Sequence, residues 1–168
     1  MSIWGKIIGG TAGFALGGPI GAIIGVMAGN VYDKSKKRNF NFNQISNQQK
    51  QNIFALSIII LSAKIAKSDG VVTKDEIMAF KEIFKIPPNE INQVSKIFNE
   101  AKKSKSGYKI IADQVGQLFS NNRLMLEELL NNLFFIAEAD GNISINEIEI
   151  LKSISQSFHL NEEDFQRV

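Results

Sequence analysis

The N-terminal segment constrains this chain most, because it is rich in glycine at a regular spacing and carries no charge. Glycine recurs at every fourth position, at Gly9, Gly13, Gly17, Gly21, Gly25 and Gly29. Since residues i and i+4 share a face of an α-helix, this spacing produces one helix face without side chains. Residues 7–28 carry no charge. About 22 helical residues cover roughly 30 Å, the thickness of a bilayer core. We therefore expect a single transmembrane helix with its flanks over residues 1–33.

The glycine face predicts self-association of that helix. In lipid, a stripe of small residues lets two helices approach closely, as in small-xxx-small motifs. Membrane lipid and a second copy of the chain are thus the first expected partners. Glycines that only make room for another packing partner are the alternative.

Three other interpretations of the segment stay open at this stage. A cleaved signal peptide is disfavoured because the apolar stretch is too long and basic residues follow it. A hairpin broken near Gly17-Gly18-Pro19 would enter and leave on one side of the membrane. A peripheral segment is the third, since glycine adds little hydrophobicity.

The flanks of the span predict its orientation. Trp4 and Tyr32 stand just outside its ends, where such rings prefer the headgroup level. The larger basic cluster follows the span and consists of Lys34, Lys36, Lys37 and Arg38. Because such clusters stay in the cytoplasm, the N-terminus should face out and the rest of the chain should face in.

Charge and composition narrow the functions open to the residues beyond the span. Residues 1–40 carry a net charge of +4, and the remainder carries −2. A near-neutral domain behind a basic junction does not resemble a nucleic-acid binder. The chain has no cysteine, which excludes disulfides and thiolate metal sites.

Beyond a basic, Asn-rich linker over residues 34–46, the patterns predict an all-α domain over residues 47–168. Apolar residues recur with helical periodicity, and no segment alternates as a strand would. The expected helices cover residues 47–67, 74–85, 89–103, 108–119, 122–138 and 145–157.

An internal two-fold repeat organises this domain. Residues 65–77 recur as residues 136–148, each copy with an Asp-Gly pair and a Glu six residues after the Gly. Each copy follows a helix that is apolar almost all round, which predicts that these two helices pack together in the middle of a bundle. The matching ends are Phe84-Lys85-Ile86 and Phe158-His159-Leu160.

The repeated corner has a structural interpretation. Gly70 and Gly141 supply a left-handed residue past a helix end. Thr73-x-x-Glu76 and Ser144-x-x-Glu147 then form capping boxes for the next helix.

Metal binding is the alternative interpretation of the same residues. Neither corner is an EF-hand, because Ile65 and Ile136 would occupy the first ligand position. Two corners brought together could still pool oxygen ligands for Ca²⁺, Mg²⁺ or Mn²⁺. These candidate ligands are Asp69, Glu76, Asp140 and Glu147.

At these residues the chain resembles two parts of a known family. The repeated Ala-x-x-Asp-Gly corner looks like that of the TerB, or tellurite-resistance, domain. The opening Trp4-Gly5-Lys6-Ile7-Ile8-Gly9, the glycine-rich span and Asp33-Lys34 resemble the N-terminus of DjlA-type, membrane-anchored DnaJ-like co-chaperones.

The resemblance implies a single-span protein of the bacterial inner membrane that dimerises through its span. It also implies a C-terminal J domain that stimulates a DnaK-type chaperone through a His-Pro-Asp motif. The only histidine here is His159, followed by Leu160, so this chain has no such motif. The second repeat stops at Val168, which suggests a truncated product, and a DnaK-type partner is expected only if a J domain follows.

Two functions stay open, and catalysis is not expected. The first is the membrane anchor, dimerisation and interaction module of a co-chaperone. The second is a membrane-tethered, TerB-like module for divalent metal or stress response. With one histidine, no cysteine and no nucleophile elbow or phosphate-binding loop, the sequence predicts no enzyme.

Overall fold

The computed structural model describes residues 47–68, 73–89, 91–103 and 107–168. This part of the chain is all-helical and contains no strand, as the sequence predicts. The helices are α3 (Asn47–Ala66), α4 (Lys74–Phe84), α5 (Ile91–Ala101), α6 (Tyr108–Leu118), α7 (Arg123–Ala137), α8 (Ile145–Ser157) and α9 (Glu162–Arg167). Helices α3 to α8 begin and end within about two residues of the predicted limits, and α9 lies beyond the last of them.

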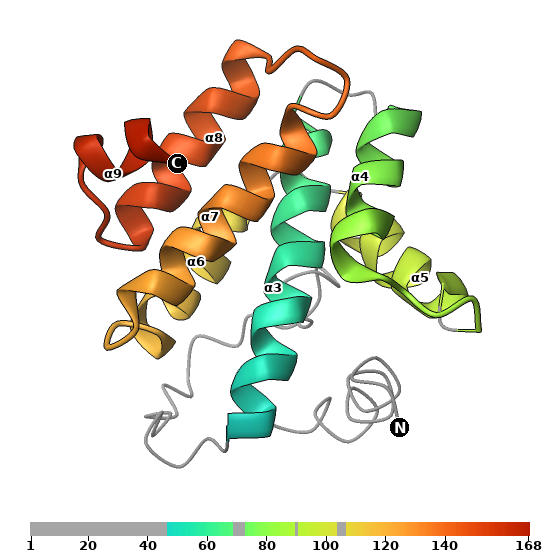
Figure 1. Ribbon diagram of the computed structural model, residues 1–168, viewed down its shortest axis with the longest axis horizontal. Helices are drawn as coiled ribbons and strands as arrows, with labels where there is room; N and C mark the ends of the chain where they lie inside the picture. Colours follow the sequence, from blue (N-terminus) through green and yellow to red (C-terminus); the bar gives the residue numbers. More distant parts are fainter. Residues whose placement is uncertain (1–46, 69–72, 90, 104–106) are drawn as a thin grey trace.

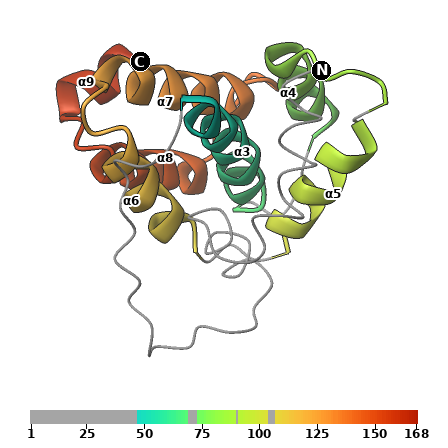
Figure 2. The same ribbon diagram turned by 90° about the horizontal axis from the view of Figure 1, so that it is seen from below.

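Helix α3 forms the centre of the bundle. From Ile53 to Ala66 nearly every side chain is buried, which fits a helix that is apolar on all sides. It packs against α5, α6, α7 and α8. In Figure 1 the other helices surround it, and Figure 2 shows the same from below. The predicted contact between α3 and α7 is confirmed.

Helices α6 and α8 cross closely at a glycine. A Cβ on Gly116 would lie 2.2 Å from the carbonyl oxygen of Ser157, far inside van der Waals contact. Only a residue without a side chain fits there without moving one of the helices.

A residue with left-handed backbone lies just beyond the end of both α4 and α8. Lys85 has a φ of 43° and His159 has a φ of 56°. Each follows a phenylalanine in the two matching ends of the sequence. His159 is exposed and lies two residues beyond the end of α8. The equivalence of the two halves as a whole remains a prediction.

Candidate functional site

Both helices that follow the Asp-Gly corners begin with the predicted capping box. The backbone N–H of Thr73 donates to the Glu76 carboxylate at 2.7 Å, and the N–H of Glu76 donates back to the Thr73 hydroxyl at 3.1 Å. At α8 the corresponding distances between Ser144 and Glu147 are 2.8 and 3.2 Å. The structural interpretation of the two glutamates is therefore confirmed.

Burial sets these two glutamates apart from ordinary capping residues. Glu76 and Glu147 are 5% and 3% exposed, although a carboxylate is seldom buried unless it has partners. The reciprocal hydrogen bonds satisfy part of each carboxylate, and each of the two residues makes a further interaction. In Figure 1, α4 and α8 both start toward the upper end of the bundle, where α3 and α7 finish.

The second corner has the turn expected of an Asp-Gly pair. Gly141 has a φ of 86°, the left-handed region that glycine enters without steric cost. Its N–H donates to the carbonyl of Glu138 at 2.8 Å, which closes a turn just beyond α7. The exposed Asp140 carboxylate accepts a hydrogen bond from the N–H of Asn142 at 3.0 Å. Asp140 thus stabilises its own turn.

The four proposed metal ligands are only partly described by the structure. Asp69 and Gly70 lie outside the described residues. Among the residues that are described, no three His, Cys, Asp or Glu side chains gather as a metal site requires. Glu76 and Glu147 serve as capping residues and Asp140 faces solvent, so metal binding at these corners stays the alternative interpretation.

A buried lysine close to the first corner was missed by sequence reasoning. Lys64 lies in the last turn of α3 and is only 3% exposed. Burial lowers the pKa of its ammonium group, because a charge is poorly solvated inside the protein. Its neighbours Ile58–Ala66 form an almost unbroken apolar run, and this was the available signal that the lysine would be buried too.

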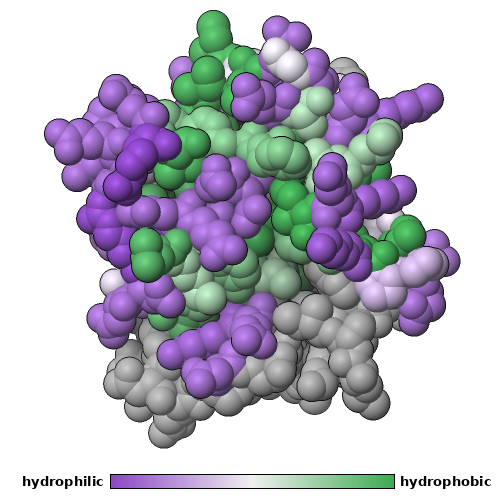
Figure 3. Space-filling model, viewed as in Figure 1, coloured by the Kyte–Doolittle hydropathy of each residue, from purple (hydrophilic) through white to green (hydrophobic). Residues whose placement is uncertain are grey.

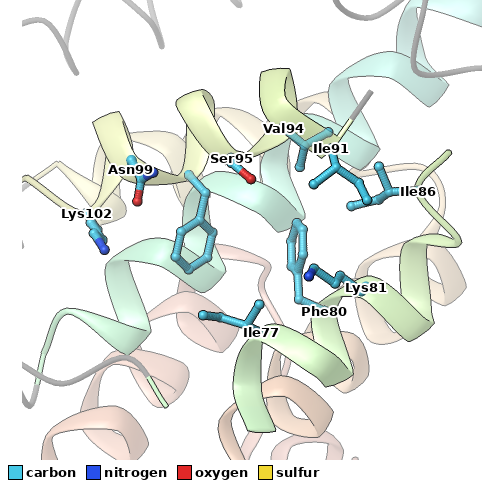
Figure 4. A pocket seen from close by; sticks show the side chains of 10 residues that line it. Ile77, Phe80, Lys81, Ile86, Ile91, Val94, Ser95, Asn99 and Lys102 are labelled. Carbon is cyan, nitrogen blue, oxygen red and sulfur yellow. The ribbon is translucent and has the colours of Figure 1, made fainter. Parts of the chain in front are cut away.

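An apolar recess lies between α4 and α5. It has a volume of about 170 Å³. Phe80 points from α4 toward α5, and Ile77, Val94 and Ile86 complete the apolar wall (Figure 4). The ring of Phe80 packs at 5.7 Å from that of Phe98. An engineered cavity of about 150 Å³ in another protein binds benzene, so this recess has room for about one ring or one large aliphatic side chain.

Polar groups stand at the edge of this recess. Lys102 lies at one end and Lys81 beside Phe80, and Ser95 and Asn99 offer a hydroxyl and an amide (Figure 4). Neither lysine forms an ion pair with any residue in the described part of the chain. An apolar recess edged by two available cations suits an apolar side chain with acidic neighbours.

The predicted span and its flanks cannot be followed in these helices. Gly9, Gly13, Gly17, Gly21, Gly25 and Gly29, and the basic residues Lys34, Lys36, Lys37 and Arg38, all lie outside the described residues. Within the described ranges, no helix has both the length and the apolar character needed to cross a membrane.

Comparison with known proteins gives a match at each end of the chain. Residues 55–168 match the family described as tellurite resistance protein TerB. Residues 1–39 match the family described as the co-chaperone DjlA transmembrane domain. The all-helical fold agrees with the TerB match, which covers more than half of the chain, so the chain belongs to the TerB family. Ahead of this domain, residues 1–39 are similar to the DjlA transmembrane domain, as the sequence indicated.

Several curated relatives carry the same two parts. A co-chaperone protein DjlA of Legionella pneumophila is 28% identical over 159 residues, which cover 90% of this chain and 53% of that protein. The DjlA of Photobacterium profundum is 26% identical over 176 residues, covering 98% of this chain and 64% of its own length. The DjlA of Coxiella burnetii is 26% identical over 163 residues, which cover 92% of this chain and 60% of that protein. The chain thus spans a little over half to just under two thirds of these relatives. No solved structure matches it significantly.

Proposed function

We propose that this chain is the membrane-anchored interaction and dimerisation module of a DnaJ-like co-chaperone. The observation that carries the proposal is the pairing of a DjlA-type transmembrane domain at residues 1–39 with a TerB domain at residues 55–168. Three relatives with both parts are described as co-chaperones. The chain holds no His-Pro-Asp sequence, so its own contribution is to localise and to bind.

The proposed placement is a single span in the bacterial inner membrane. The N-terminus faces out, and the helical domain faces the cytoplasm. Support comes from the basic cluster that follows the uncharged segment, since such clusters resist export. The glycine face of the span holds two copies together in this proposal.

The recess between α4 and α5 is the proposed docking point for a partner protein. A single apolar side chain would fill the space between Phe80 and Val94, and acidic neighbours would approach Lys81 and Lys102. Interfaces of this kind derive most of their affinity from a few anchor side chains in preformed pockets.

An ATPase measurement tests whether this chain anchors and binds without stimulating a DnaK-type chaperone. The chain, reconstituted in lipid nanodiscs, should leave the ATPase rate of a DnaK-type chaperone at its basal value. The same chain with a J domain fused after Val168 serves as the positive control and should stimulate the ATPase. Stimulation by the chain alone would contradict the proposal, because it would require J-domain chemistry from residues that lack the motif.

A further inference from the structure

Helix α7 presents an outward face that no other described element covers. Leu124 is 76% exposed and Phe135 is 51% exposed, so both apolar side chains lie largely in solvent. Glu128 and Asn131 lie between them on the same face and are exposed as well. In Figure 2, α7 lies at the upper edge, the side that faces the viewer in Figure 1. Figure 3 shows separate hydrophobic areas among hydrophilic ones on this face.

The spacing of these four residues is that of a helix-pairing seam. Steps of four, three and four residues lead from Leu124 through Glu128 and Asn131 to Phe135. This is the spacing of the a and d positions in a helix-pairing heptad, here with apolar residues at the two ends and polar residues at the two central positions. The buried face of α7 is on its other side, where Leu126, Leu129 and Leu133 meet the core.

Grooves lie on both sides of the seam. One has a volume of about 350 Å³ and includes Phe54, Ile83, Phe84 and Met125 among its walls. The other has a volume of about 370 Å³ and includes Leu124, Asn131 and Arg167. A ridge flanked by grooves is the shape that a second, similar ridge complements.

The order of the residues makes the seam complementary to itself. If two copies of α7 lie antiparallel about a two-fold axis, Leu124 of one meets Phe135 of the other, and Glu128 meets Asn131. Both apolar residues are then covered, and each carboxylate faces an amide that can donate a hydrogen bond. A parallel pair would instead place Glu128 against Glu128, and like charges repel.

We infer that the outward face of α7 pairs with the same face of a second copy of this chain, in antiparallel orientation. Such isologous contacts are the commonest way in which proteins form dimers. One helix pair is smaller than a standard stable interface. The inference therefore rests on the proposed membrane anchoring, which confines the copies and raises their effective concentration.

Disulfide cross-linking tests this contact, because the chain has no cysteine of its own. Leu124→Cys and Phe135→Cys are placed on two differently tagged full-length copies, expressed together and oxidised in native membranes. The antiparallel pair predicts a disulfide between the two tags. Either variant expressed alone should cross-link no more than background, because the two positions are about 16 Å apart along the helix and a disulfide needs Cα atoms within about 7 Å. Gln117→Cys, exposed on α6, replaces Leu124→Cys in the matched control.

A negative charge introduced on this face provides a second test of the contact. Asn131→Asp should lower the cross-linking yield several-fold, because it faces Glu128 of the partner copy. Adding Glu128→Lys to both copies should restore the yield, because each new lysine then faces the new aspartate of the other copy. If the yield of the disulfide between the two tagged copies is no higher than in the Gln117→Cys control, the inference is wrong. It is also wrong if Leu124→Cys cross-links to itself, because that result indicates a parallel pair. Carbonate extraction of the same membranes distinguishes the two possible failures. A chain that is released by carbonate contradicts the proposed anchoring. A chain that stays in the membrane but forms no disulfide contradicts only the α7 contact.

Discussion

Arg123, the first residue of α7, donates a hydrogen bond from its guanidinium group to the buried carboxylate of Asp164 in α9. The two residues lie 41 positions apart in the sequence, and the bond joins the last described helix to the bundle. Asp164 also caps α9, since its carboxylate accepts the N–H of Asn161 at 2.8 Å. Arg167 reaches the same carboxylate at 3.2 Å.

The partners of Asp164 predict an acid-sensitive attachment of α9. The Asn161 N–H and the Arg123 and Arg167 charges hold the pKa of this carboxyl below its usual value. Because the pKa is lower in the folded state, the stabilisation is present above the pKa of the unfolded chain, near 4, and is lost as the pH falls through the folded value. Thermal unfolding of the full chain in detergent, followed from pH 7 to pH 3, should show a smaller acid-induced fall in Tm for Asp164→Asn. An equal fall in both proteins would contradict this assignment.

Gly116→Ala should destabilise the domain. Alanine normally favours a helix interior over glycine by about 0.5–1 kcal/mol. Here its Cβ would meet the Ser157 carbonyl oxygen at 2.2 Å, a backbone atom that cannot move without shifting α8. We expect a net loss of about 1–3 kcal/mol in the free energy of unfolding, measured by chemical denaturation. The neighbouring exposed variant Gln117→Ala is the control and should change stability by less than about 0.5 kcal/mol.

The capping boxes predict similar losses of stability when either cap, at α4 or at α8, is removed. Ser144→Ala removes the hydroxyl that accepts the Glu147 N–H, and should cost about 1 kcal/mol of stability. Thr73→Ala should cost a similar amount for the same reason. Ser144→Asp keeps an acceptor at the helix start and is the matched control. If Ser144→Ala and Ser144→Asp unfold at the same denaturant concentration, the side-chain cap contributes nothing.

Divalent ions distinguish capping from metal binding at the corners. Because Glu76 and Glu147 already accept capping hydrogen bonds, we expect the Tm of the full chain to stay unchanged in millimolar Ca²⁺, Mg²⁺ or Mn²⁺. An ion that binds the folded state alone would raise the Tm. A rise that disappears in the double variant Asp69→Asn, Asp140→Asn would therefore establish the metal site instead.

The glycine face of the span makes its own prediction. Gly17→Leu together with Gly21→Leu adds bulk to the face where two helices would approach, and should weaken self-association in a membrane two-hybrid reporter. Leucine at Ala15 and Ala22, which lie off the period-four positions, is the matched control. Dimerisation that withstands the glycine changes would remove this face from the account.

Local sequence signals predicted most of the fold. The 3.6-residue periodicity located the helices, and Ser or Thr three residues before Glu located both capping boxes. Two apolar helices were expected to pack together, and α3 and α7 do. These features depend on residues close in sequence or on one strong apolar pattern.

The remaining features depend on residues that only the tertiary structure brings together. Nothing local marks Arg123 as the partner of Asp164, or Gly116 as a crossing point with Ser157. The recess between α4 and α5 exists because Phe80 and Phe98 approach from different helices without filling the space between them. The outward seam of α7 was equally hidden, because its helix is apolar on several sides and only packing decides which side stays exposed.

Membrane extraction with protease mapping tests the central claim most directly. Inner-membrane vesicles that contain the full chain are washed with carbonate in one sample. In another, protease is added outside vesicles of either orientation. We expect the chain to stay in the pellet, and the helical domain to be digested only in vesicles whose cytoplasmic side faces outward. Release into the wash, or protection of the domain in those vesicles, would contradict a membrane-anchored module that works in the cytoplasm.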